Sequence, residues 1–178
     1  VKKSVLELGS NDAYVVLDDA DLKVAVEACV MGRIVNNGET CVSAKRFIVT
    51  EKNYDGFKEA FVSAMKAIKM GDPNLDDTDL GPMAREDLRD KLHQQVSDSI
   101  KAVASLIKAK NDQDAMRIAN DSRYGLGGGI FSQDEDKAIK LAREVFDTGM
   151  ININGYGLAH PNLPFGGVKD SGYGREHG

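Results

Sequence analysis

Apolar residues recur along this chain with two alternating periods. Short, nearly continuous apolar runs favour β-strands, and longer stretches with an apolar residue every three or four positions favour amphipathic helices. The predicted strands cover residues 4–8, 13–17, 46–50, 103–107, 126–131 and 150–153. The predicted helices cover residues 22–30, 54–68, 88–100, 111–119 and 134–146.

Polar residues mark the ends of several of these elements. Acidic residues at 18–21 supply the N-cap and first turn of the first helix, and Gly71–Pro73 ends the second. Asn111 and Asp134 stand where two later helices begin. Strands that alternate with helices in this way imply parallel crossover connections. We therefore predict an α/β fold with an open, mostly parallel sheet covered by helices.

Length and charge narrow the class of protein. The 178 residues fit one domain or slightly more. A net charge of −5 argues against a nucleic-acid partner, because such binding depends on an excess of Lys and Arg. No apolar run reaches the about 20 residues that span a bilayer, and Glu7 interrupts what would be the apolar part of a signal peptide. We expect no membrane partner and a cytoplasmic protein.

The chain has two cysteines, which lack the spacing of a metal site and are too few for a disulfide framework. Cys29 lies on the apolar stripe of the first predicted helix and is expected in the core. Cys41 ends a polar turn that contains a glycine. Solvent can reach such a thiol and nearby backbone N–H groups can stabilise its thiolate, although a small buried filler fits the same pattern.

Glu7 is a second candidate for chemistry. It stands between Leu6 and Leu8 in an apolar strand, where burial would raise its pKa and suit it to general-base catalysis. On an edge strand the same glutamate would simply face water. Cys41 follows Glu7 by 34 positions. We expect both side chains to face one crevice at the carboxyl ends of the parallel strands.

Two glycine-rich stretches carry weaker signals. The run at 125–129 precedes a strand, whereas a dinucleotide-binding fingerprint follows a strand and opens a helix, so we interpret it as close backbone packing. The irregular stretch at 164–176 is long enough to be functional, although a solvated tail would look similar. The three histidines give no local support for a Cys–His pair.

Four motifs, taken in order, resemble the aldehyde dehydrogenase superfamily. They are LELG at 6–9, NGETC at 37–41, NDSRYGL at 120–126 and PFGGVKDSG at 164–172. The 34-residue interval between acid and thiol is the one that this family uses. The succinate-semialdehyde dehydrogenase branch gives the best resemblance at residues 72–73, at residues 80–83 and over the helix from 85 to 96.

The resemblance implies a role for each candidate. Cys41 would be the nucleophile that adds to an aldehyde, and Glu7 the base that activates water to hydrolyse the resulting thioester. Leu8 and Gly9 would lie near the nicotinamide of NAD or NADP, and Phe165 would line the aldehyde funnel. The expected partners are a small-molecule aldehyde and further copies of the chain in a homo-oligomer.

The sequence departs from the family pattern in three ways. Ser10 stands where the family usually has a second glycine, and Glu39 where it usually has glutamine; an inward-pointing carboxylate there would oppose thiolate formation. Between Ile100 and Val103 the family has a longer segment, with a glutamate that holds the nicotinamide ribose. The family's N-terminal nucleotide-binding half and its closing C-terminal strand also have no counterpart.

Residues 1–178 are therefore expected to form a single catalytic domain or a fragment of one, with a missing segment near 100–103. In one interpretation, the function belongs to a longer parent enzyme that oxidises an aldehyde to a carboxylic acid. In the other, the chain is a non-oxidising relic or fragment with weak thioesterase or esterase activity, or with a structural role. The presence of both Glu7 and Cys41 favours the first.

Overall fold

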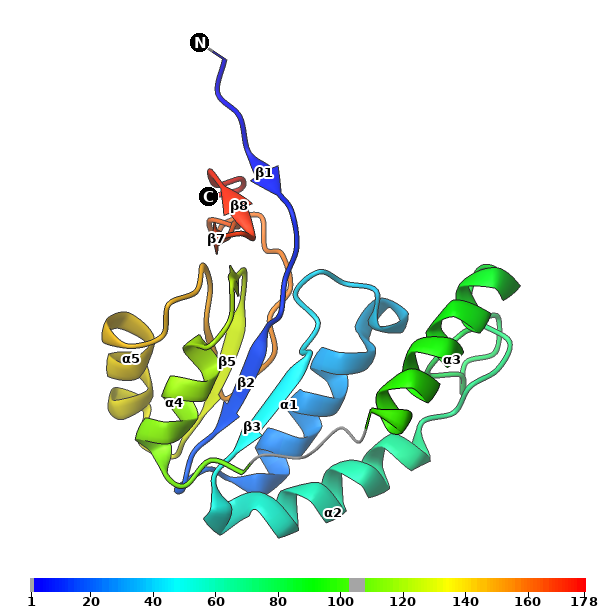
Figure 1. The fold of residues 1–178 in the computed structure, drawn as a ribbon, viewed down its shortest axis with the longest axis horizontal. Helices are drawn as coiled ribbons and strands as arrows, with labels where there is room; N and C mark the ends of the chain where they lie inside the picture. The colour runs from blue at the N-terminus through cyan, green and yellow to red at the C-terminus, as the bar shows by residue number, and fades with distance from the viewer. Residues whose placement is uncertain (1, 103–107) are drawn as a thin grey trace. The chain divides into compact units, whose positions relative to one another are not determined.

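A computed structural model describes residues 2–102 and 108–178 of the chain. The chain divides into two compact units, one formed by residues 1–66 and 108–178 and the other by residues 67–107. Figure 1 shows the order of the elements. The strand predicted at 103–107 lies outside the described residues.

A four-stranded parallel sheet forms the centre of the first unit. Its strands are β2 (Ala13–Val16), β3 (Arg46–Val49), β5 (Gly128–Phe131) and β6 (Asn152–Ile153). Their order across the sheet is β3-β2-β5-β6, and every pairing is parallel. Ala13 lies opposite Arg46 on one side and Gly128 on the other. The predicted open, mostly parallel sheet is confirmed.

Four helices accompany this sheet, and polar caps fix where three of them begin. They are α1 (Leu22–Ile34), α2 (Glu51–Ala67), α4 (Asp112–Asn120) and α5 (Glu135–Glu144). The Asp21 carboxylate accepts hydrogen bonds from the first-turn N–H groups of α1, at 2.9 and 3.2 Å. Asn111 and Asp134 each accept one such bond in α4 and α5, at 2.9 and 3.0 Å. The three predicted N-caps are confirmed. The expectation of acidic residues in the first turn of α1 is wrong, because the other two acids precede the helix and its first turn contains none.

Alternating residues of the strands divide between the two faces of the sheet. On one face, the rings of Tyr14, Phe47 and Phe131 pack together, and Phe47 meets Phe61 of α2 at a centroid distance of 4.8 Å. Helix α1 covers the same face: a Cβ at its Gly32 would lie 2.8 Å from the Tyr14 hydroxyl, so only glycine permits this approach.

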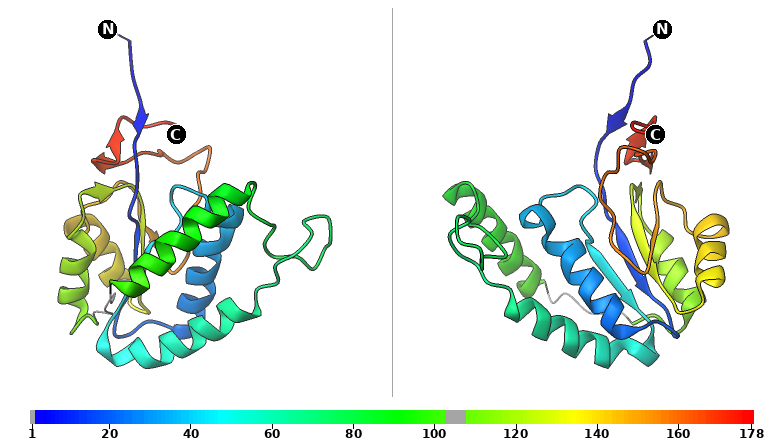
Figure 2. Two further views of the ribbon diagram at one scale, coloured as in Figure 1. Left: turned by 45° about the vertical axis from the view of Figure 1, so that its right-hand side comes forward. Right: turned by 180° about the vertical axis from the view of Figure 1, so that it is seen from behind.

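The other face of the sheet carries a mainly aliphatic cluster. Val15 and Ile130 are fully buried there against Met116 of α4, Ala138 of α5 and Phe146. Figure 2 shows α1 on one side of the strands and α4 and α5 on the other. The sheet is therefore covered on both faces, which explains why its strands read as continuous apolar runs rather than alternating ones.

Two short antiparallel pairs lie outside the parallel sheet. β1 (Leu6–Glu7) pairs with β8 (Gly172–Tyr173), and β4 (Tyr124–Gly125) pairs with β7 (Val168–Lys169). The strand predicted at 4–8 is thus shorter than expected and belongs to a different sheet from residues 13–16. The stretch at 164–176 is not a free tail, because its two strands, β7 and β8, pair with β4 and β1.

The glycine run at 125–129 serves close packing, as predicted. A Cβ at Gly125, Gly127 or Gly128 would come within 2.6 to 2.8 Å of a side chain from another segment. The strand predicted at 126–131 begins only at Gly128, and Gly125 pairs with Val168 in a separate antiparallel pair.

The second unit contains α3 (Glu86–Lys101), which confirms the helix predicted at 88–100. Its first turn carries Glu86 and Asp87, and its last residue is Lys101, so both ends complement the helix dipole. A short bridge joins Met70 to Leu80 earlier in this unit.

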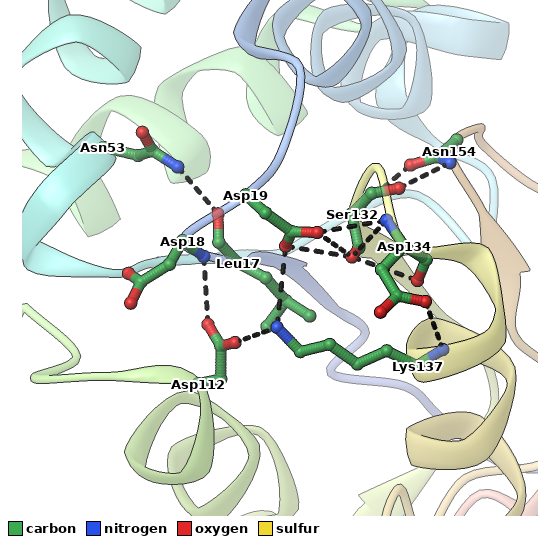
Figure 3. Close-up of polar contacts among 9 residues, drawn as sticks. All are labelled: Leu17, Asp18, Asp19, Asn53, Asp112, Ser132, Asp134, Lys137 and Asn154. Carbon is green, nitrogen blue, oxygen red and sulfur yellow. Dashed lines mark hydrogen bonds and ion pairs between the residues drawn. The ribbon is translucent and has the colours of Figure 1, made fainter.

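A network of hydrogen bonds and ion pairs connects the segments that follow β2 and β5 (Figure 3). The Asp19 carboxylate accepts hydrogen bonds from the Ser132 hydroxyl at 2.7 and 2.9 Å and from the Asp134 N–H at 3.0 Å. Lys137 forms an ion pair with the same carboxylate at 3.6 Å. Burial raises the pKa of Asp19, but these hydrogen bonds and the Lys137 charge outweigh it and hold the pKa below its ordinary value.

This network predicts a loss of stability in acid. A lowered carboxyl pKa stabilises the fold at pH values above the ordinary Asp pKa, and this contribution disappears as the pH falls through the folded-state value. Asp19→Asn should lower the free energy of unfolding at pH 7 by about 1–2 kcal/mol, a moderate figure because the side chain is 34% exposed. Urea titrations at several pH values measure this. The difference from wild type should shrink at low pH, and Asp76→Asn, at an exposed loop position, should change little.

Candidate active site

The Cys41 thiol lies on a turn between α1 and β3. After α1 the chain forms a short 3-10 helix, η1 (Val35–Gly38), in which Asn36 and Asn37 adopt φ values of 52° and 55°. Asparagine tolerates this left-handed conformation better than most residues. The Ser43 N–H then donates to the Thr40 carbonyl at 2.9 Å, which closes the turn around Cys41. Cys41 is exposed, as the polar turn predicted, and Cys29 is fully buried in α1.

The turn lies at the amino edge of the parallel sheet, so the predicted position at the carboxyl ends is wrong. Cys41 precedes β3, and Glu7 and Gly9 precede β2. Because the strands are parallel, the segments that precede them meet at one edge. The crevice rule applies to loops that follow strands. In this chain those loops carry the Asp19 network instead (Figures 1 and 3).

Glu7 is held in place by β1 and β8. It lies opposite Gly172, and the next residue, Leu8, donates its N–H to the Ser171 carbonyl at 3.0 Å. The Glu7 side chain is largely exposed in this chain. Partial desolvation, together with the charge and hydrogen bond of the neighbouring Glu176 carboxyl group, raises its pKa. Glu7 therefore combines a raised pKa with access to water.

The electrostatic surroundings of Cys41 include two carboxylates. Burial raises the pKa of its thiol, and the negative charges of Glu7 and Asp12 raise it further. A hydrogen bond from the Val42 N–H and the positive charge of Lys45 lower the pKa but do not cancel the increase. The turn was expected to favour the thiolate, and its N–H group does so, yet the net shift has the opposite sign.

Asp12 and Lys45 are contributors that the sequence reasoning missed. Asp12 is 2% exposed, and its carboxylate accepts the Gly127 N–H at 3.0 Å. Lys45 donates to the Cys41 carbonyl at 2.8 Å. In the sequence, Asp12 stands directly before an apolar strand and Lys45 stands four residues after the thiol. Neither residue belongs to a periodic pattern that would have indicated a role.

Phe165 is buried beside the thiol turn. Its ring packs in a cluster with Val42 and Leu126, and its backbone exchanges hydrogen bonds of 2.7 and 2.9 Å with Glu176. It lines a cavity of about 370 Å³ whose wall also includes Val42 and Asp12. The cavity therefore reaches the residue that follows Cys41, and the role of Phe165 in an aldehyde funnel stays a prediction.

Leu8 and Gly9 lie between Glu7 and β2, with Leu8 exposed and Gly9 partly buried. The Leu8 side chain is 65% exposed. Gly9 has a φ of 155°, and a Cβ there would lie 2.9 Å from the Tyr124 ring. Only glycine fits this position without strain. The contact of Leu8 and Gly9 with a nicotinamide ring stays a prediction.

Within residues 2–102 and 108–178, no three His, Cys, Asp or Glu side chains gather as metal ligands would. The helices of the same residues include none with the length and apolarity to cross a membrane.

The sequence profile of the aldehyde dehydrogenase family matches residues 1–107 and residues 101–178. The chain belongs to this family. It is 40% identical to the succinate semialdehyde dehydrogenase [NAD(P)+] Sad of Escherichia coli and 37% identical to succinate-semialdehyde dehydrogenase [NADP(+)] 1 of Mycobacterium tuberculosis. Both alignments cover 99% of this chain but only 46 and 47% of the relatives. This aldehyde dehydrogenase chain therefore spans about half the length of its relatives.

Solved structures of aldehyde dehydrogenases have the same fold. The succinic semialdehyde dehydrogenase of Streptococcus pyogenes, in complex with NADP+, superposes with a TM-score of 0.90 at 33% identity. The betaine aldehyde dehydrogenase of Staphylococcus aureus, in complex with NAD+, gives 0.91 at 27%. The superpositions cover 99 and 98% of this aldehyde dehydrogenase chain, and 47 and 43% of the other two.

The exposure of the two cysteines predicts selective labelling. Iodoacetamide should modify Cys41 well before Cys29, because Cys29 is fully buried and its burial raises its pKa strongly. Peptide mass spectrometry after timed quenching measures each site separately. Equal labelling of both cysteines in the folded protein would contradict the assignment of Cys41 as the accessible thiol.

A matched pair of charge variants tests which carboxylate acts on Cys41. Glu7→Gln removes a charge that disfavours the thiolate, so the midpoint of the pH profile for Cys41 alkylation should fall by about half a pH unit. Glu39 lies only two residues from Cys41 but is exposed. Glu39→Gln should leave the midpoint almost unchanged. The reverse order of effects would show that Glu39, not Glu7, faces the thiol.

Proposed function

We propose that this chain carries the thiol and the general base of an NAD(P)-dependent aldehyde dehydrogenase whose parent enzyme oxidises an aldehyde to a carboxylic acid. The observation that carries the proposal is that the Glu7 carboxyl group lies near enough to the exposed Cys41 thiol for its charge to raise the thiol pKa, on this family's fold. The names of the relatives make succinate semialdehyde the first substrate to test.

The chemistry follows from the side chains. The Cys41 thiolate adds to the aldehyde carbonyl carbon and forms a thiohemiacetal. A backbone N–H such as that of Val42 can donate to the thiolate sulfur or to the oxygen on which negative charge develops. Oxidation of this adduct leaves a thioester on Cys41. Glu7 then takes a proton from water, which attacks the thioester carbon, and the acid leaves as the thiol is restored. The raised pKa of Glu7 suits a base that works near neutral pH.

NAD(P)⁺, when bound, would supply the acceptor for the hydride, which no protein side chain can take. In this chain Leu8 offers an exposed apolar surface for a flat ring, and Gly9 keeps the backbone beside it free of a side chain. Leu8 and Gly9 would therefore hold the nicotinamide end of the cofactor. Most of the cofactor site would lie in a nucleotide-binding part outside these residues.

Two features of the comparisons support a missing internal segment as well. The family profile matches in two pieces that meet at residues 101–107, and the alignments run over 216 residues although the chain has 178. We infer that relatives have an additional segment close to residues 100–103. We also propose that the parent enzyme is a cytoplasmic homo-oligomer, in which Phe165 lines the aldehyde funnel.

The second candidate is a non-oxidising fragment or relic with weak esterase or thioesterase activity, or with a structural role. Acylation and deacylation need only a thiol, a base and water, and the Cys41 and Glu7 side chains are both exposed to solvent. The parent enzyme and the esterase fragment both predict ester hydrolysis, whereas a purely structural role predicts none. Only the parent enzyme transfers hydride.

Ester hydrolysis by the 178-residue chain tests the proposed roles. We expect slow turnover of p-nitrophenyl acetate, with a burst of p-nitrophenol that Cys41→Ala abolishes and Cys29→Ala leaves intact. Glu7→Gln should keep the burst but slow the subsequent turnover, because deacylation alone needs the base. A burst that survives in Cys41→Ala would contradict the nucleophile assignment.

Aldehyde oxidation distinguishes the chain from its parent. We expect no NADH or NADPH formation from succinate semialdehyde by the isolated chain, since positioning the cofactor can supply about 7–11 kcal/mol of the barrier. Absorbance at the reduced-nicotinamide band measures this directly. Robust NADH formation would mean that a complete cofactor site lies within these 178 residues. A structural role would show as no burst and no oxidation.

A further inference from the structure

Lys45 makes an unusual set of contacts behind the thiol turn. Its ammonium group donates to the Cys41 carbonyl at 2.8 Å, to the Ser43 carbonyl at 2.9 Å and to the Ser10 hydroxyl at 2.8 Å. An ammonium group has three N–H donors, so these contacts use all of them. Lys45 immediately precedes β3, whose first residue pairs with Ala13 of β2, so its stem begins at a fixed point of the sheet edge.

Ser10 connects the thiol turn to the segment that carries Glu7. The Ser10 hydroxyl accepts from Lys45 and donates to the Cys41 carbonyl. The Cys41 carbonyl therefore receives hydrogen bonds from both side chains. Ser10 lies three residues after Glu7, on the stretch that leads from β1 into β2. One ammonium group thus joins the two segments that carry the proposed nucleophile and base.

Charged groups of both signs act on Lys45. Partial desolvation of its ammonium group lowers the pKa of Lys45, the Asp12 carboxylate raises it, and the Arg33 guanidinium lowers it. Asp12 is itself almost completely buried, and one of its carboxylate oxygens has no hydrogen-bond partner among the described residues. The groups that act on the thiol are Glu7, Asp12 and Lys45, and Lys45 is the cation among them.

We propose that Lys45 is a positioning residue for the proposed nucleophile: its ammonium group fixes the Cys41 carbonyl against Ser10, and places a positive charge beside a thiol otherwise faced by carboxylates. This inference rests on the proposed function of Cys41. Ser10, which replaces a glycine usual in the family, acts here as the second anchor of the same turn.

The three hydrogen bonds of Lys45 distinguish a positioning role from simple space filling. A neutral side chain of similar length could occupy the same volume, but it could neither hold three oxygen atoms at once nor favour a thiolate. Lys45 is also exposed in this chain, so its aliphatic stem contributes little to the core. Its main effect is therefore expected on the ionisation of Cys41 rather than on global stability.

The pH profile of Cys41 alkylation, measured in the 178-residue chain, tests the proposal. Lys45→Met should move the midpoint up by about half a pH unit, which slows labelling about threefold below the midpoint. Lys45→Arg keeps the charge and should restore most of the shift. Lys140→Met, on the exposed side of α5, is the control and should leave the profile unchanged. Protection of buried Cys29 in each variant shows that the fold persists.

The outcomes separate this inference from the function on which it rests. An unchanged midpoint in Lys45→Met, or an equal shift in Lys140→Met, would overturn the role of Lys45 while the wild-type p-nitrophenyl acetate burst still supports Cys41. A missing wild-type burst would overturn the proposed function instead. Where Lys45→Met exposes Cys29, Lys45→Gln carries the test, since it is neutral but keeps a hydrogen-bond donor. The same upward shift is expected there, and no shift would contradict the proposal.

Discussion

The parallel pairing of β2 with β3 and β5 determines where the candidate residues lie. Ala13 sits between Arg46 and Gly128 in the register, so the segments before these residues must meet at the amino edge of the sheet. Asp12 connects them: its carbonyl accepts the N–H groups of Lys45 and Arg46 at 3.0 and 3.1 Å, and its carboxylate accepts that of Gly127. A shift of one residue would separate these partners and turn every side chain to the other face.

The charges brought together at this edge oppose one another at the thiol. Glu7 and Asp12 raise the pKa of Cys41, whereas the Val42 N–H and the Lys45 ammonium group lower it. In the proposed mechanism, this arrangement keeps the proposed base Glu7 near the proposed nucleophile, while the Lys45 charge offsets part of the increase in the thiol pKa. The same arrangement explains the two expected shifts. Removing the Glu7 charge should lower the pKa of Cys41, and removing the Lys45 charge should raise it.

Local patterns predicted most helices and the parallel sheet, because the period of apolar residues and caps such as Asp21 are properties of short segments. The polar turn also predicted the exposure of Cys41. The pairing of β1 with β8 could not be predicted, since Leu6 and Tyr173 are distant in sequence and each strand has two residues. The edge on which Cys41 lies was predicted wrongly, because the general rule for parallel sheets describes loops that follow strands. The contacts of Lys45 could not be predicted either, because it donates to backbone carbonyl groups whose positions depend on the folded turn.

The central claim is that Cys41, and no other side chain, accepts an acyl group at the amino edge of the sheet. Peptide mass spectrometry of the Glu7→Gln variant, quenched with acid after incubation with p-nitrophenyl acetate, tests it most directly, because the slowed deacylation should let the acyl-enzyme accumulate. The account predicts one acetyl group, on the peptide that contains Cys41, and its loss on treatment with hydroxylamine, as for a thioester. An acetyl group on Cys29 or on a lysine, or no stable adduct at all, would contradict it.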